Sequence, residues 1–190
     1  MTAANESSAL RTGFKIGNKA IAKNAALAMS KFGTRTLELA LGSGLFSLNG
    51  SSVANAEDGI LEAVTMPDAN TGNMRVAFEL PAEWDSTPTD VIVEIYWKAT
   101  VTTGDAKFTG EMGMKASGED VAVTETQTVV TTTNTTADKI NKSSMTFTGS
   151  NFAAADLIGL NIKRDPADAS DTLATDLKIL GVIIKFTGIG

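Results

Sequence analysis

The chain has neither cysteine nor histidine among its 190 residues. Without cysteine, no disulfide and no thiolate metal site can hold the fold. Without histidine, the chain lacks the commonest general base and the commonest transition-metal ligand, and a Ser-His-Asp triad is excluded. These two absences remove the most familiar routes to catalysis. We therefore expect a protein that is not an enzyme and that carries no cofactor.

Long apolar runs are absent as well. No stretch approaches the roughly 20 apolar residues that span a bilayer. Basic residues interrupt the apolar part of the front end, where a secretory signal would keep an unbroken apolar block. We expect no membrane partner. Aromatic residues are only 6% of the chain, so each large aromatic side chain has to be weighed individually.

Charge is divided unevenly along the chain. Residues 1–37 have a net charge of +5, and the other 153 residues have a net charge of −11. A basic segment ahead of an acidic body indicates that the front end binds an acidic partner. The residues that we expect to bind this partner are Arg11, Lys15, Lys19, Lys23, Lys31 and Arg35.

Two regions follow from this division. Residues 1–59 are predicted to be an N-terminal basic arm and linker with an anchoring or assembly role, and residues 60–190 a β-sandwich domain. The alanine-rich, proline-free stretch within residues 1–33 has helical spacing and ends at Gly33. Residues 49–59 have the composition of a linker.

Alternating apolar residues predict strands through most of the chain. Between residues 34 and 50 the alternation favours a hairpin that turns at Gly42-Ser43-Gly44, with a helix over 34–41 as the alternative. Later runs predict strands over 74–80, 91–97, 108–115, 121–133, 145–148, 157–163 and 177–186.

No helical pattern separates the later strands, which favours an antiparallel sandwich. Gly110 and Gly113 suggest bulges or bends in one strand. The residues that we expect to face inward between the two sheets are Val76, Phe78, Val93, Ile95, Trp97, Phe147, Leu160, Ile162, Ile179 and Ile184.

Three segments resemble the β-sandwich proteins of tailed-bacteriophage particles. They are FELPAEWD at 78–85, VIVEIYWKAT at 91–100 and LNIKRDPADASDTLATDLKILGVIIKF at 160–186. The resemblance implies a mainly β fold, an antiparallel jelly-roll-like β-sandwich, here preceded by an N-terminal arm with a short helix. It also implies a virion structural protein that forms a homotrimer and contacts capsid or tail proteins. It carries over no catalytic residue.

Four aspartates gather around Pro166, and calcium binds clustered carboxylates. Their spacing does not match a calcium loop, and Arg164 stands beside the cluster. The alternative is a solvated loop whose aspartates cap turns. The aspartates are Asp165, Asp168, Asp171 and Asp176, of which the first three would be the calcium ligands.

Carboxylates are frequent elsewhere, and a glycosidase needs two of them across a sugar cleft. No motif marks such a pair, so we interpret these residues as surface charge on strands. They are Glu83, Asp85, Glu94, Glu111, Glu119, Asp120 and Glu125. Of the amphipathic aromatics Trp84, Tyr96 and Trp97, Trp97 is in phase with core residues, whereas Trp84 is the candidate for an exposed contact.

Three functions remain open at this point. The first is a non-enzymatic virion component, either capsid-associated, decoration, fibre or tail, that oligomerises through its sandwich and docks by its arm. The second is a single jelly-roll coat protein whose basic arm binds nucleic acid in the particle. The third is a carbohydrate-binding module, with a host glycan as partner. The basic residues are spread singly rather than in a block, which favours an acidic protein surface over nucleic acid for the arm.

Overall fold

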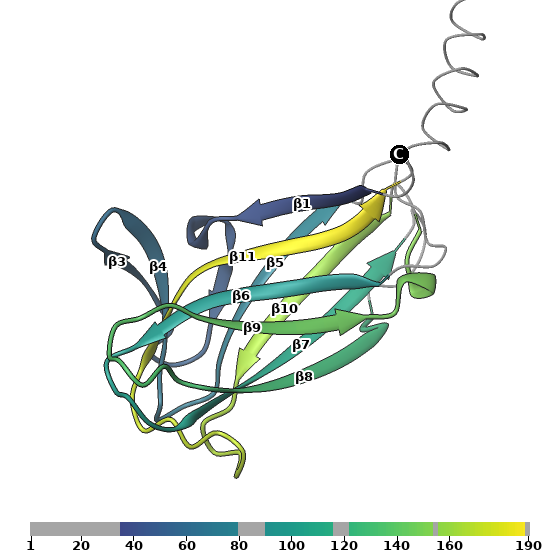
Figure 1. The fold of residues 1–190 in the computed structure, drawn as a ribbon. Coiled ribbons are helices and arrows are strands. Elements are labelled where there is room, and N and C mark those ends of the chain that lie inside the picture. The colour runs from purple at the N-terminus through teal and green to yellow at the C-terminus, as the bar shows by residue number, and fades with distance from the viewer. Residues whose placement is uncertain (1–34, 80–89, 116–121, 154–155, 189–190) are drawn as a thin grey trace, which may run out of the picture. The chain divides into compact units, whose positions relative to one another are not determined.

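The computed structural model describes residues 35–79, 90–115, 122–153 and 156–188. Residues Thr36–Thr187 form one compact unit, drawn as a ribbon in Figure 1. The predicted helical arm lies outside the described residues. Within them, eleven strands are assigned to two sheets, so the predicted mainly β sandwich is confirmed.

Sheet A contains six of the described strands. Their order is β3-β4-β11-β6-β9, with β1 also paired to β11. The bounds are β1 Arg35–Leu41, β3 Ala54–Asp58, β4 Leu61–Met66, β6 Val91–Ala99, β9 Asn141–Phe147 and β11 Leu177–Gly188.

Sheet B contains the other five described strands, in the order β2-β5-β10-β7-β8. Two short 3-10 helices, η1 (Ser43–Leu45) and η2 (Gly149–Asn151), lie in connections between strands. The bounds of the strands are β2 Ser47–Asn49, β5 Gly72–Glu79, β7 Asp105–Lys115, β8 Glu125–Thr132 and β10 Leu157–Arg164. None of the helices in the described part of the chain has the length and apolar character needed to cross a bilayer.

The core lies between the two sheets, as strand alternation predicted. Eight of the ten predicted core residues are buried, and Val76 and Phe78 are partly buried against the core. Trp97 is fully buried, as expected. Its ring meets Phe108 edge-on at 5.8 Å between centroids, and its indole Nε1 donates a hydrogen bond to Ser143 Oγ at 2.9 Å.

The first three strands of the sandwich, β1 to β3, differ from the prediction. β1 pairs with β11 in sheet A and β2 pairs with β5 in sheet B, so the predicted hairpin is wrong, and so is the alternative helix. The segment from Gly42 to Phe46 carries the chain from one sheet to the other. Residues 49–59 are not simply a linker, because β3 within them pairs with β4 in sheet A. Strands of the sandwich therefore begin well before residue 60.

Of the two alternatives at Gly110 and Gly113, the bulge is wrong, since β7 keeps an unbroken register with β10 through both glycines and with β8 from Asp105 to Met112. Gly110 serves packing instead. A Cβ at this position would lie 2.8 Å from Met145 Cε and 3.0 Å from Phe147 Cζ across the core. The register shift lies in β11, between Ile179 and Gly181.

Candidate functional site: a hollow on the outer face of sheet B

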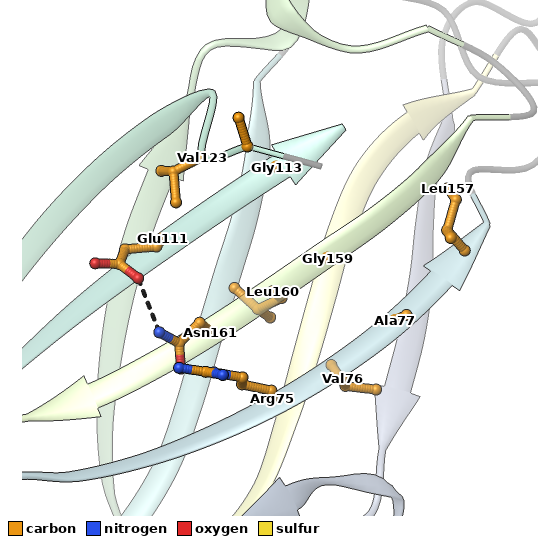
Figure 2. A pocket seen from close by; sticks show the side chains of 11 residues that line it. Arg75, Val76, Ala77, Glu111, Gly113, Val123, Leu157, Gly159, Leu160 and Asn161 are labelled. Atoms are coloured by element: carbon orange, nitrogen blue, oxygen red, sulfur yellow. Dashed lines mark hydrogen bonds between the residues drawn. The ribbon is translucent and has the colours of Figure 1, made fainter. Parts of the chain in front are cut away.

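Three small residues lie side by side on the outer face of sheet B. Gly159 of β10 is opposite Ala77 of β5 on one side and opposite Gly113 of β7 on the other. Because no side chain in this row extends beyond a Cβ, the sheet surface is open above Gly159, while the backbone of Ala122 lies against Gly113. The resulting pocket, which we call the sheet B hollow, has a volume of about 380 Å³ and is shown in Figure 2.

Apolar and polar side chains surround this floor. Leu157 and Val123 line the hollow and are 57% and 56% exposed. A polar row lies next to the row of small residues, two positions further along each strand. It consists of Arg75 of β5, Asn161 of β10 and Glu111 of β7, which are in register. The hollow thus combines an apolar floor with planar polar groups at one side, which is the usual composition of a small-ligand site.

Hydrogen bonds connect the polar row. Arg75 Nε donates to Asn161 Oδ1 at 3.4 Å, and Asn161 Nδ2 donates to Glu111 Oε2 at 2.8 Å. Lys163 Nζ donates to the other oxygen, Glu111 Oε1. The hydrogen bond from Lys163 holds the pKa of Glu111 below its ordinary value, against a smaller opposing effect of burial. Glu111 is therefore a carboxylate at neutral pH and is not suited to donate a proton.

On the outer face of sheet A, a cluster of charged side chains surrounds Glu94. Glu94 of β6 is 5% exposed there, and its carboxylate accepts hydrogen bonds from Tyr96 Oη and Lys142 Nζ, each at 2.9 Å. Lys185 Nζ lies 3.1 Å from Glu94 Oε2 and 3.3 Å from Glu38 Oε1. Burial raises the pKa of Glu94, but the hydrogen bonds from Lys142, Lys185 and Tyr96 outweigh it, and the pKa lies below its ordinary value.

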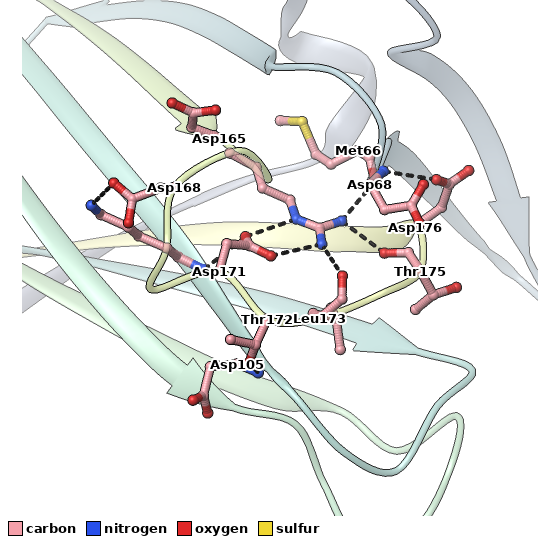
Figure 3. A network of polar contacts seen from close by, with 12 residues as sticks. Met66, Asp68, Asp105, Asp165, Asp168, Asp171, Thr172, Leu173, Thr175 and Asp176 are labelled. Carbon is pink, nitrogen blue, oxygen red and sulfur yellow. Dashed lines mark hydrogen bonds and ion pairs between the residues drawn. The ribbon is translucent and has the colours of Figure 1, made fainter.

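Arg164 organises the aspartate cluster. It is fully buried at the end of β10 and donates to both carboxylate oxygens of Asp171, at 3.0 Å each (Figure 3). Its remaining N–H groups reach the backbone oxygens of Leu173 at 2.7 Å and Thr175 at 2.8 Å, and those of Met66 and Pro67 at 3.3 Å. This arginine therefore fastens the β10–β11 loop to the end of β4.

The other aspartates of the cluster are also engaged by the chain's own donors. Asp165 accepts from Ala167 N and from Thr71 Oγ1, and Asp168 accepts from Ser170 N and Lys107 Nζ. Asp176 accepts from Asp68 N. The backbone hydrogen bonds of Asp165 and Asp168 are those expected for the alternative of a loop whose aspartates cap turns, rather than for calcium ligands. Among the described residues, no group of three or more acidic side chains is arranged to hold a metal ion.

Of the carboxylates that the sequence analysis singled out, three lie within the described residues, and each has different surroundings. Glu94 is on the outer face of sheet A, and Glu111 is on the outer face of sheet B. Glu125, at the start of β8, accepts from Thr148 N and Asn151 Nδ2, each at 2.9 Å. Glu83, Asp85, Glu119 and Asp120 lie outside the described residues.

The predicted contact residues are mostly outside the described part of the chain. This holds for Trp84 and for Arg11, Lys15, Lys19, Lys23 and Lys31, while Arg35 is the first residue of β1. The sequence did not point to the hollow, because its floor is made of residues from three distant strands. The available signals were Gly113 and Gly159, since an isolated glycine within a strand often marks a close approach of another molecule or backbone.

The sequence matches no family model and no curated protein. Solved structures do match. One is a family 35 carbohydrate-binding module from an environmental isolate, with a TM-score of 0.50 and 11% identity over 77% of this chain and 91% of the module. Another is an exo-β-1,3-galactanase from Phanerochaete chrysosporium, with a TM-score of 0.50 and 9% identity over 78% of this chain and 29% of the galactanase.

A third match is the C-terminal family 6 module of a laminarinase from Zobellia galactanivorans. Its TM-score is 0.47 at 13% identity, over 78% of this chain and 98% of the module. At these identities the two structures with a TM-score of 0.50 show the fold alone, a β-sandwich of the jelly-roll kind. None of the three structures is a phage protein, and nothing in the comparisons shows a phage origin.

Proposed function

We propose that the chain binds carbohydrate without catalysis, and that the sheet B hollow is its binding site. The observation that carries the proposal is the composition of the hollow. A sugar ring has an apolar C–H face and a rim of hydroxyls, and the hollow offers an apolar floor beside an amide, a carboxylate and a guanidinium. The fold shared with a family 35 carbohydrate-binding module supports the same function.

Geometry sets the size of the ligand that fits. A volume of about 380 Å³ accommodates one or two sugar rings. The hollow lies on a rigid sheet, and Asn161 and Glu111 are oriented by their own hydrogen bonds. A ligand would therefore meet polar groups that are already in place, which lowers the entropic cost of binding.

Gly159→Val is the decisive variant. A Cβ at residue 159 has only Gly113 O near it, at 3.9 Å, so a side chain there fills the hollow without disturbing the backbone. Thr128→Val, on the exposed face of β8 and outside the lining of the hollow, is the matched control.

The full-length protein and both variants would be applied to a glycan array, and hits would be measured by calorimetry. We expect the parent chain and Thr128→Val to bind the same glycans, and Gly159→Val to lose at least about 10-fold in affinity, because a branched side chain occupies the ring's position. If no glycan binds the parent chain, or if Gly159→Val binds as well as the parent, the proposal is wrong.

The second candidate function is a virion component that docks by its N-terminal segment. The charge difference between residues 1–37 and the rest of the chain favours it. The resemblance of residues 160–186 to phage β-sandwich proteins gives weaker support. Arg164 and Asp171 within this segment bind each other and hold the loop, so these two residues do not point to a contact with a particle.

Deletion of residues 1–33 tests this second candidate. We expect the truncated protein to keep its β-sheet circular dichroism, because Thr36–Thr187 is compact by itself, but to lose binding to its particle. Reversal of Arg11, Lys15, Lys19 and Lys23 to glutamate should weaken docking to an acidic protein. Retention of the isolated chain on DNA at about 150 mM salt would instead favour the coat-protein alternative.

A further inference from the structure

The two charged side chains of the sheet B hollow differ in how many hydrogen bonds and ion pairs they make. Arg75 and Glu111 are the two charged side chains among its described lining residues. Glu111 is already neutralised, because Lys163 binds one of its oxygens and Asn161 binds the other. Arg75 is exposed and uses only Nε, in a 3.4 Å hydrogen bond to Asn161. It forms no ion pair in the described part of the chain.

This leaves a cation beside a floor that offers no counter-charge. The terminal nitrogens of Arg75 carry four N–H groups, and they have no partner among the described residues. Ala77, Gly159 and Gly113 beside them provide no acceptor side chain. With Lys163 counted, the polar row carries one positive charge in excess, within a body of the chain whose net charge is −11. The excess positive charge of the polar row is thus opposite in sign to the net charge of residues 38–190.

From this imbalance we infer that the hollow selects acidic saccharides, in which a ring carboxylate binds Arg75 while the ring lies on the small-residue floor. The inference rests on the proposed function and specifies its ligand class. A planar carboxylate matches the forked donors of a guanidinium and accepts two parallel hydrogen bonds. A neutral sugar presents hydroxyls only and leaves most of the charge of Arg75 unmatched.

A pair of probes distinguishes the contribution of the carboxylate to binding from that of the saccharide backbone. An oligogalacturonate and its full methyl ester have the same backbone and differ in charge. A sulfated galactan of similar length tests whether sulfate, a second source of negative charge, is accepted equally. Affinities would be measured by calorimetry on the full chain at low and at physiological salt.

The variants distinguish the contribution of Arg75 to binding from the attraction of other basic residues to a polyanion. Arg75→Gln removes the positive charge. Arg75→Lys keeps the charge but removes the two parallel N–H donors of the guanidinium. Lys139→Gln, at an exposed lysine that is not part of the lining of the hollow, makes the same change of net charge elsewhere. Gly159→Val keeps every charge and fills the site. The basic N-terminal segment is present in every variant, so its attraction to the probe is the same throughout.

The inference predicts that the oligogalacturonate binds about 10-fold to 100-fold more tightly than its methyl ester. Arg75→Gln should remove this preference, Arg75→Lys should keep part of it, and Lys139→Gln should keep all of it. Equal binding of acid and ester, with Gly159→Val still blocking both, would overturn the inference and leave the proposed function standing. Binding of the acid that neither Arg75→Gln nor Gly159→Val weakens would place the contact elsewhere and overturn both. A tighter sulfated probe would replace carboxylate by sulfate as the ligand group and overturn the inference as stated.

Discussion

Arg164 and Arg75 are both on strands of sheet B, and their surroundings differ completely. Arg164 shares the inward phase of Ile158, Leu160 and Ile162 on β10, and it is fully buried with its donors bound to a carboxylate and four backbone oxygens. Arg75 has the outward phase of β5 and makes one long hydrogen bond. The comparison shows that strand phase decides whether an arginine holds the fold or remains available to a ligand.

The largest expected effect comes from removing the buried arginine. Arg164→Met should reduce the free energy of unfolding by about 3–5 kcal/mol, because it leaves the Asp171 carboxylate buried without its partner. Urea unfolding followed by circular dichroism measures the change. The double variant Arg164→Met with Asp171→Leu should be less destabilised than the single one, since no charge remains buried. A loss below about 1 kcal/mol in the single variant would mean that the arginine does not fasten the loop.

The two glycines of the hollow should respond oppositely to valine. A Cβ at Gly113 would overlap the backbone oxygen of Ala122, so Gly113→Val should cost about 1–3 kcal/mol. Gly159→Val has open space and should be neutral or stabilising by up to about 1 kcal/mol, because a strand prefers a β-branched residue to glycine. Parallel urea unfolding of both variants tests this difference. Equal losses at the two positions would contradict the geometry of the floor.

Acid should weaken the outer face of sheet A. The pKa of Glu94 in the folded protein lies below 4.5, its ordinary value, so its contribution to stability is present above that value and is lost as the pH falls through the folded pKa. Glu94→Gln should therefore flatten the decline in unfolding free energy below about pH 5. Urea unfolding from pH 6 to pH 3 follows this slope. An unchanged slope in the variant would show that other carboxylates account for the acid sensitivity.

The smallest expected effect completes the comparison of the two arginines. Arg75→Gln should change the free energy of unfolding by no more than about 0.5 kcal/mol, because the side chain is exposed and makes one weak hydrogen bond. Thermal and urea unfolding beside the parent chain provide the measurement. A loss as large as that of Arg164→Met would assign Arg75 to the fold and weaken its assignment to a ligand.

Alternation within single strands could be predicted, and pairing between strands could not. The run from Met74 to Phe78 correctly indicated a strand and its inward face, because side-chain direction depends only on local geometry. The destinations of β1 and β2 depend on contacts with β11 and β5, which are distant in sequence. The predicted hairpin failed for this reason.

The hollow could not be predicted for the same physical reason. Its floor needs Ala77, Gly113 and Gly159 at matching register positions, and register between distant strands is a property of the whole sheet. From the sequence alone, Gly113 was therefore interpreted as a bulge or a bend. Arg164 is a different case, since its place beside the aspartate cluster was visible in the sequence, but its complete burial was not.

The place of β11 in sheet A has a consequence for how the protein forms during synthesis. β11 is the last strand in chain order, yet it lies between β6 on one side and β4 and β1 on the other, with the shift at Ile179/Gly181 close to Leu41 of β1. Sheet A cannot be completed until β11 has left the ribosome, and until then β4 and β6 have unpaired edges. Such distant pairings slow folding and expose strands to wrong partners. We expect refolding on the time scale of milliseconds to seconds, with chaperone dependence greatest while the nascent chain still ends before residue 177.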